Sequence, residues 1–416
     1  MSRPGILDPV ATLFLRIGAW YLRTRWAQWA ALAALVASAW MLTLGIPLVE
    51  PFNPYRIDVD VYRIGGLMML EGRSLYGEIP PTEIGVGLPF TYPPIAAVFF
   101  TVFAVMPLAW ASYLLSVATV AATVAVIALV LRAVTDLRGA ALAAVTVAAS
   151  AVLLWLDPVH QSLDFGQVNS LLMLAVVLDV VVGRGRWWRG GFTGLAIAIK
   201  LTPAVFLAFF LVRRDWRALG VALASFALWT GIGFLVRPAD SLQYWSETLT
   251  DTGRIGMPGY ASNQSLNGFI HRIAGDDVSG LWWFLGCAVV GLFVLALIHR
   301  LGEREVAGMT AMGLYALFAS PVSWSHHWVW MVPTVILMLH LGVRRGGVAP
   351  WAWLAVGAVT LFHGPQWWWA YEGDAAYHWA WWQQILGNAW LWLLLAAYAI
   401  LWVYGGSRSR SSTEHG

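Results

Sequence analysis

The sequence is poor in charge: only 11% of its 416 residues are Asp, Glu, Lys or Arg, whereas 59% are hydrophobic. A soluble domain typically carries about 25% charged residues, and a soluble chain of this size could not cover its surface with so few. A transmembrane β-barrel would show short alternating segments rather than long apolar runs. The composition therefore excludes a soluble enzyme and predicts an all-α polytopic membrane protein.

The sequence also lacks the cysteines and motifs that several classes of functional site require. The single cysteine, Cys287, cannot form a disulfide within one chain. The sequence contains no HExxH motif, carboxylate-rich metal box, Walker loop, GxSxG elbow or Rossmann fingerprint. The net charge of +3 is too small to indicate a nucleic-acid partner. We therefore predict no metal site and no firm cofactor, and we leave a requirement for a divalent metal open.

Long apolar runs are abundant, and a spanning helix needs about 20 mostly apolar residues. We expect about 10–12 spans in a single membrane domain over 27–404, preceded by a basic segment 1–26 and followed by a polar tail 405–416. The expected spans are 27–48, 110–131, 139–156, 168–183, 216–236, 281–299, 305–320, 328–343, 350–366 and 384–404. Two shorter pieces, 94–106 and 190–212, are bounded or interrupted by prolines, so we expect broken or re-entrant segments there.

The distribution of arginine predicts an orientation, because cytoplasmic loops are enriched in Lys and Arg. If 94–106 and 190–212 do not fully cross, every basic cluster lies in the cytoplasm. The segments 50–92, 157–167, 237–280, 321–327 and 367–383 then lie outside. If the two pieces do cross, 157–167 changes sides with the cluster at 184–189. We also expect the first span to be retained rather than cleaved as a signal peptide.

Polar side chains collect in these outer segments, beginning directly after the first span. Asp58 and Tyr62 are four residues apart, so they share a face if a short interfacial helix starts there. Helix capping is the alternative role for Asp60. Tyr92 lies in a stiff turn, Pro89-Phe-Thr-Tyr-Pro-Pro94, whose alternative role is only to rigidify the loop.

A second cluster lies at the mouth of a helix and contains His160, Asp164, Gln167 and Asn169, just after Asp157. Polar groups beside a membrane span are costly unless they are paired or used. Sugar hydroxyls are natural partners for such donors and acceptors. Helix capping explains one or two of these residues but not the whole set, so we predict that the cluster binds substrate.

Cations and histidines complete the set of candidates. Lys200 interrupts an apolar stretch, where it either snorkels to the interface or binds a phosphate or carboxylate. Arg254 lies in the long segment 237–280 and either meets a lipid phosphate or is simply solvated. The adjacent His326 and His327 project in different directions, so they cannot both bind one metal. Their pocket of Trp and Ser favours a functional role over a structural one.

These motifs together resemble glycosyltransferase family 87, integral membrane enzymes of the C-type fold, over roughly 50–345. The motifs are Tyr55-Arg-Ile-Asp-Val-Asp-Val-Tyr62, Leu88-Pro-Phe-Thr-Tyr-Pro-Pro94, Asp164-Phe-Gly-Gln-Val-Asn169, Lys200-Leu-Thr-Pro203, Asn263-Gln-Ser265 and Ser320-Pro-Val-Ser-Trp-Ser-His-His-Trp328. The chain is similar to actinobacterial mannosyltransferases that use polyprenyl-phosphate mannose. Such enzymes add α-(1→2) mannose to phosphatidylinositol mannosides or to lipomannan.

The resemblance implies that Asp58, the acidic residue of the first outer segment, is catalytic and that His326 or His327 belongs to the active site. Transfer from a β-linked donor to an α-glycoside inverts configuration, which needs one base and little general acid. For the donor phosphate we expect Arg254 first, then Arg63 and Lys200, because Gly253 and Gly256 let backbone amides approach the same anion.

The resemblance also implies the remaining substrate contacts and the partners. The predicted substrate-binding residues are Asp60, Tyr62, Arg63, Tyr92, His160, Asp164, Gln167, Asn169, Lys200, Arg254, Asn263 and Gln264. The predicted partners are polyprenyl-phosphate mannose, a glycolipid acceptor and membrane lipids, at an outward-facing site of the cell membrane. The alternatives are a polyprenyl-linked pentose or other hexose transferase of the same fold, a lipid-linked sugar flippase and a non-catalytic scaffold. A transporter usually shows internal repeats, and we find none.

Overall fold

The computed structural model describes residues 8–44 and 55–405, and within these ranges every regular element is helical. The predicted all-α class is therefore confirmed. The elements are α1 (Asp8–Arg23), α2 (Arg25–Leu44), α3 (Ile57–Leu70), α4 (Pro94–Ala104), α5 (Leu108–Val134), α6 (Gly139–Leu153), α7 (Asp157–Phe165), α8 (Asn169–Val177), η1 (Leu178–Val182), α9 (Gly191–Ile199), η2 (Thr202–Ala204), α10 (Val205–Val212), α11 (Trp216–Val236), α12 (Pro238–Gln243), η3 (Tyr244–Thr248), η4 (Thr252–Ile255), α13 (Leu266–Ala274), α14 (Gly280–Leu301), α15 (Glu305–Ala319), η5 (Ser325–Trp330), α16 (Met331–Arg345), α17 (Val348–Thr360), η6 (Pro365–Trp367), η7 (Ala375–His378), α18 (Trp381–Gly387) and α19 (Ala389–Gly405).

Five helical segments of the described chain are long and apolar enough to cross a membrane: α2, α5, α11, α14 and the continuous Ser325–Arg345. The number rises to seven if α6 with α7, bent by 74°, and α18 with α19, bent by 59°, each form one span. The shorter apolar helices at 94–104, 169–182, 202–212 and 305–319 fall on segments that the sequence also marked. Residues 1–7, 50–54 and 406–416 of the predicted terminal and loop segments lie outside the described residues.

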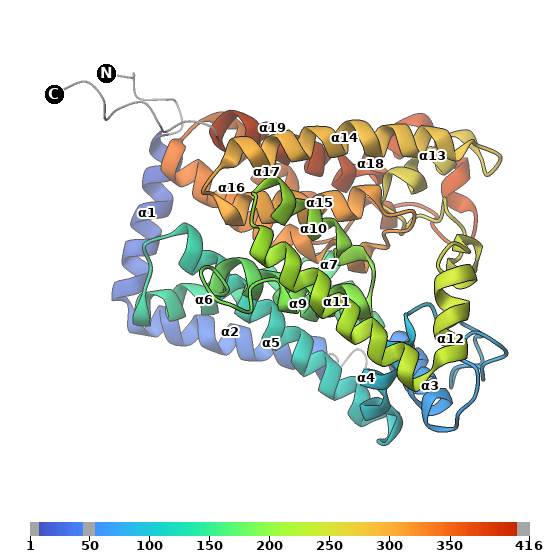
Figure 1. Cartoon of the computed structure of the whole chain (residues 1–416). Coiled ribbons are helices and arrows are strands. Elements are labelled where there is room, and N and C mark those ends of the chain that lie inside the picture. Colours follow the sequence, from blue (N-terminus) through green and yellow to red (C-terminus); the bar gives the residue numbers. More distant parts are fainter. Residues whose placement is uncertain (1–7, 45–54, 406–416) are drawn as a thin grey trace.

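The segments predicted to lie outside come together at one end of the molecule, which we call the site end (Figure 1). Hydrogen bonds connect them in pairs: Leu75 with Asp240, Gln264 with Ser323 and Trp367 with Asp157. The arginine-rich turns meet at the opposite end, where Arg184 pairs with Glu303 and Arg344 pairs with Asp136. The outward orientation of the site end stays a prediction of the charge pattern.

The proline-interrupted segment 190–212 forms a re-entrant hairpin. α9 runs inward from the arginine-rich end, and η2 with α10 returns to that end. The residues that flank the hairpin contact each other, since Arg189 Nε lies 3.0 Å from Asp215 Oδ2. The helix breaks at Lys200, whose backbone is extended at φ −149° and ψ 126°, three residues before Pro203. The expected break in this segment is thus confirmed, and Lys200 lies at the tip of the hairpin.

The apolar core consists of two main clusters, and the candidate site lies where they meet. One cluster joins α3, α4 and the first turns of α5 and includes Val59 and Tyr62. The larger cluster surrounds α15, α16 and α19 and includes Trp328. Asp58 and His327 therefore stand directly beside residues of different cores, so packing on both sides fixes their separation.

The basic N-terminal segment contains a helix that the sequence reading did not predict. α1 packs against α2, α6 and α16, and Tyr21 Oη donates to the carbonyl of Ala144 at 2.9 Å. Its apolar residues recur at helical spacing, among them Leu13, Phe14 and Ile17, all of which are exposed on the isolated chain. That periodicity was the available signal for an amphipathic helix.

Candidate active site

The first part of the site is the start of α3. Gln167 Nε2 donates to Asp58 Oδ2 at 2.5 Å, and Tyr62 Oη donates to Gln167 Oε1 at 3.1 Å. Tyr92 Oη lies 2.9 Å from Tyr62 Oη and 3.4 Å from Gln167 Oε1. The prediction that Asp58 and Tyr62 share a helix face is confirmed, because both contact the same amide side chain.

A tight backbone turn places Gln167 against Asp58. Gly166 ends α7 in the left-handed region, at φ 74° and ψ 51°. A Cβ atom there would lie 2.4 Å from Val59 Cγ2 and 2.8 Å from Arg56 Cβ. Only glycine allows this approach of the α7–α8 turn to the start of α3, so two motifs more than 100 residues apart share one site.

The second part of the site is the tip of the re-entrant hairpin. Lys200 Nζ donates to Asn169 Oδ1 at 3.1 Å and lies 3.3 Å from His327 Nε2. Asn169 Nδ2 in turn donates to the carbonyl of His326 at 3.0 Å. The ammonium also lies 5.5 Å from the centre of the Tyr92 ring, within the range of a cation–π contact.

The electrostatics of Asp58 suit a base. Burial raises the pKa of this carboxyl from its ordinary value of 3.8 to about 6, whereas the hydrogen bond from Gln167 and the charge of Lys200 act in the opposite direction. Desolvation disfavours the ionised form of a carboxyl, which makes it a better proton acceptor once it is ionised. A pKa near 6 lets Asp58 be ionised at neutral pH and still take up a proton readily.

A small cavity of about 50 Å³ adjoins the lysine, with Asn169, Lys200 and His327 at its polar end. It has room for a few water molecules, since each needs roughly 10–15 Å³ by this measure. Its remaining lining is largely apolar and comes from α8, η2, α10, α15 and η5: Leu172, Met173, Val176, Thr202, Pro203, Phe206, Ala316, Leu317, Val329 and Trp330. A charged group thus adjoins a cavity with mostly apolar walls.

The two adjacent histidines have different surroundings. His327 faces Lys200, whereas the His326 ring lies 4.9 Å from the Phe165 ring and 4.6 Å from the His327 ring. Neither ring nitrogen of His326 has a hydrogen-bond partner in the described chain, although both are buried. Within residues 8–44 and 55–405, no group of three or more His, Cys, Asp and Glu side chains could hold a metal ion.

The sequence was compared with known proteins. The model of glycosyltransferase family 87 matches residues 90–323. The chain is 40% identical to the "Polyprenol-phosphate-mannose-dependent alpha-(1-2)-phosphatidylinositol mannoside mannosyltransferase" of Mycobacterium tuberculosis, over 84% of each chain. It is 35% identical to the "Polyprenol-phosphate-mannose-dependent alpha-(1-2)-phosphatidylinositol pentamannoside mannosyltransferase" of Mycolicibacterium smegmatis, over 72% of this chain and 74% of that protein.

The chain belongs to glycosyltransferase family 87. A solved structure of ArnT from Cupriavidus metallidurans, bound to undecaprenyl phosphate, is 16% identical to this glycosyltransferase. It covers 90% of this chain and 74% of ArnT with a TM-score of 0.42. That score is too low to establish a shared fold, so the C-type fold stays a prediction of the resemblance.

Several predicted substrate-binding residues of the glycosyltransferase have contacts elsewhere. Asp60 Oδ2 accepts from the backbone N–H of Glu83 at 2.7 Å and so holds the segment 71–93. Arg63 Nε donates to the carbonyl of Met106 at 3.4 Å.

His160 Nδ1 lies 3.1 Å from Asp164 Oδ2, and both side chains are about 40% exposed. The predicted cluster at 157–169 is therefore divided: Gln167 and Asn169 face Asp58 and Lys200, whereas His160 and Asp164 pair with each other.

The long segment 237–280 contributes buried scaffolding. Asn263 Nδ2 donates to the carbonyl of Pro258 at 2.8 Å, and Gln264 Nε2 donates to that of Gly387 at 3.0 Å. Arg254 Nη2 lies 3.5 Å from the carbonyl of Tyr76. The substrate roles expected for these residues stay predictions.

Sequence reasoning missed two contributions to the site region of the glycosyltransferase. Thr202 lines the cavity beside Lys200, and its signal was its place in the Lys200-Leu-Thr-Pro203 motif. Arg272, in the long segment 237–280, is buried, with Nη1 donating to the carbonyls of Tyr260 at 3.1 Å and Asn263 at 2.8 Å. A polar sequence around an arginine does not distinguish a free cation from one that binds backbone carbonyls.

Proposed function

We propose that this family 87 glycosyltransferase transfers mannose from polyprenyl-phosphate mannose to a phosphatidylinositol mannoside or lipomannan acceptor. The product is an α-(1→2) linkage made at the outer face of the cell membrane. The names of the relatives, at up to 40% identity, support the donor and the acceptor class. The observation that carries the chemistry is the contact network that places the Asp58 carboxylate and the Lys200 ammonium in one site.

Asp58 acts as the base in this proposal. Gln167 holds one of its carboxylate oxygens, and the carboxylate takes the proton from the acceptor hydroxyl as that oxygen attacks C1 of mannose. The bond between C1 and the phosphate oxygen breaks, and its electron pair leaves with the lipid phosphate. Attack opposite a β-linked leaving group gives an α product. The phosphate is a stable anion, so no general acid is required.

Lys200 binds the donor phosphate in this proposal and stabilises the negative charge that develops on it. Asn169 and His327 hold the ammonium. Lys200 is preferred to Arg254 as the phosphate ligand. Lys200 contacts Asn169, two residues from the Gln167 that holds Asp58, whereas Arg254 Nη2 lies 3.5 Å from the carbonyl of Tyr76. A lysine serves here as a point charge, which does not need the planar fork of arginine.

Donor kinetics distinguish between Lys200 and Arg254 as the phosphate-binding cation. Lys200→Ala should raise the donor KM or lower kcat for polyprenyl-phosphate mannose by at least about 100-fold in kcat/KM, the scale of losing one charge-stabilising group in a dry site. Arg254→Ala is the matched control and should change kcat/KM by less than about threefold. The reverse pattern would transfer the phosphate site to the loop around Arg254.

A second donor is favoured by one comparison. The chain is 29% identical, over 44% of each protein, to the "Alpha-(1->3)-arabinofuranosyltransferase" of Corynebacterium glutamicum. Purified protein should be incubated with polyprenyl-phosphate mannose or polyprenyl-phosphate arabinofuranose and a panel of lipid acceptors. Radioactive mannose in an α-(1→2)-linked product supports the proposal. Transfer of arabinose alone, or movement of the donor lipid without a new glycosidic bond, would overturn it.

A further inference from the structure

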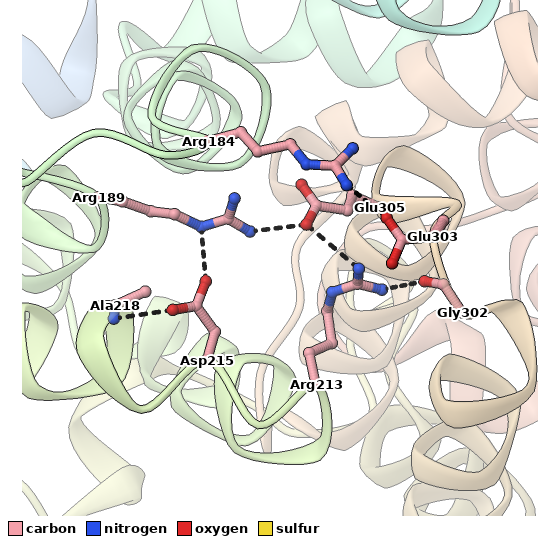
Figure 2. Close-up of polar contacts among 8 residues, drawn as sticks. All are labelled: Arg184, Arg189, Arg213, Asp215, Ala218, Gly302, Glu303 and Glu305. Atoms are coloured by element: carbon pink, nitrogen blue, oxygen red, sulfur yellow. Dashed lines mark hydrogen bonds and ion pairs between the residues drawn. The ribbon is translucent and has the colours of Figure 1, made fainter.

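The root of the hairpin is a cluster of ionic side chains at the arginine-rich end of the molecule. Figure 2 shows the contacts within this cluster. Glu305 Oε1 lies 3.1 Å from Arg189 Nη2 and 3.2 Å from Arg213 Nη2, so one carboxylate binds the residues at both ends of the helical hairpin. Arg189 also pairs with Asp215, which caps α11 by accepting from the N–H of Ala218 at 3.1 Å. We call this set the root cluster: Arg184, Arg189, Arg213, Asp215, Glu303 and Glu305.

The centre of the root cluster is dry. The side chains of Arg189, Arg213 and Glu305 are only 6%, 11% and 12% exposed. Removing charges from water is expensive, and a buried ion pair often stabilises no more than a well-packed apolar group would. What it does provide is a fixed geometry, because moving α15 away from the hairpin would leave the Glu305 carboxylate without either of its two arginine partners. The arrangement indicates a device that sets position.

The hairpin can transmit that position, since α9 packs backbone to backbone on α11. A Cβ atom at Gly190 would lie 2.1 Å from the carbonyl oxygen of Ala218, and one at Gly194 would lie 2.3 Å from that of Ala222. Asp179, fully buried in η1, also accepts from the N–H of Thr193 at 2.6 Å. This close small-residue packing leaves α9 little freedom to slide.

The returning helix of the hairpin, α10, is also fixed by packing. Arg213 lies over the Phe209 ring at 5.5 Å, and Phe209 contacts α15 where a Cβ atom at Gly308 would lie 3.2 Å from its ring. α15 also begins with Glu305 itself. The two helices of the hairpin, α9 and α10, thus connect the root cluster to Lys200 and are both closely packed. The position of the hairpin relative to the root cluster therefore fixes the position of the ammonium.

We propose that Glu305 is a positioning residue for Lys200: it joins Arg189 to Arg213 and thereby sets the height at which the hairpin presents the ammonium to the donor phosphate. The inference rests on the proposed function of Lys200. It assigns to a carboxylate at the arginine-rich end of the molecule an effect on the donor and not on the acceptor.

The test is a double-mutant cycle in donor kinetics. Glu305→Gln should lower kcat/KM for polyprenyl-phosphate mannose about tenfold or more, mainly through donor KM, and leave the acceptor KM within twofold. In the Lys200→Ala background the same change should have little further effect, because residues that act as a unit are strongly non-additive. Arg213→Lys, which keeps the charge, should give the same pattern in a milder form and serves if Glu305→Gln does not fold.

The matched control is Glu303→Gln in the same cluster. Glu303 pairs with Arg184, but the side chains are 83% and 59% exposed, so the pair should contribute little. We expect donor kinetics like those of the unmodified enzyme. An equal loss from Glu305→Gln with and without Lys200, or an unchanged donor KM, would overturn the positioning role. A Lys200→Ala protein with normal donor kinetics would instead refute the proposed function of Lys200.

Discussion

Two neighbouring carboxylates at the start of α3 have different tasks. Asp58 faces Gln167, whereas Asp60 accepts from the N–H of Glu83. Asp58→Asn should lower transfer by about 10²–10⁴-fold, because an amide cannot accept the hydroxyl proton. Asp60→Asn is the control, since an amide oxygen can still accept from Glu83, and transfer should stay near normal. Single-turnover assays on protein of confirmed fold measure both, and a fully active Asp58→Asn variant would remove this base.

The raised pKa of Asp58, about 6, predicts a pH profile. The base must be ionised, so kcat/KM should fall about tenfold per pH unit below pH 6 and level off just above it. This acidic limb should be absent from the residual activity of Asp58→Asn. A profile of the unmodified enzyme that is flat down to pH 4.5 would contradict the assignment.

The same group affects stability with a definite sign. Because the pKa of Asp58 is higher in the folded protein than its ordinary value of 3.8, the folded state binds more protons between pH 4 and 6. Stability therefore falls as pH rises through that window. Asp58→Asn removes the cost of an ionised buried carboxyl, so its thermal midpoint should exceed that of the unmodified protein at pH 7.5 and equal it near pH 4. A lower midpoint at pH 7.5 would contradict this.

The sequence predicted the relative placement of site residues where that placement depends only on local helix geometry. The spacing of Asp58 and Tyr62 sufficed to place both on one helix face. Local spacing contains no information on distant partners, so it could not reveal that Gln167 bridges both of them or that Asp164 turns away toward His160. These outcomes depend on the Gly166 turn and on the packing around it.

At the level of elements, α9 and α11 form an interface of close backbone contacts. Gly194→Ala should push α9 from α11 and lower both thermal stability and donor kcat/KM, because the new Cβ would lie 2.3 Å from the carbonyl of Ala222. Gly220→Ala on α11 is the control. No atom lies within 4 Å of a Cβ at that position, and alanine favours a helix by about 1 kcal/mol. Equal midpoints for the two variants would show that the interface tolerates a methyl group.

Most membrane-spanning elements were predictable because apolar length alone indicates them. The hairpin 190–212 was recognisable as broken from Pro203, but the contact between Arg189 and Asp215 was not, because charge pairing depends on the final packing. Helices of mixed polarity, such as α1, α12 and α13, were missed. Their apolar faces are short, and their positions depend on neighbours.

For the whole molecule, the arrangement into a site end and an arginine-rich end predicts which residues are accessible from each side. In a Cys287→Ala background, Asp277→Cys should react with a membrane-impermeant thiol reagent on intact cells, because the site end is expected to face outward. Asp136→Cys, at a side chain that is 91% exposed at the other end, should react only after permeabilisation. The opposite labelling pattern would invert the proposed orientation.

The hairpin root also bears on how the enzyme becomes competent during its synthesis. Arg189 and Lys200 leave the ribosome long before Glu305, which lies 116 residues after Arg189, and His327 follows later still. A nascent chain therefore carries its lysine through membrane insertion without Glu305 and His327, two of the groups that set the position of the ammonium. Fragment 1–277 alone should release no sugar from the donor lipid, and coexpressed 278–416 should restore transfer. An incompletely synthesised chain would thus not consume the cell's lipid-linked mannose.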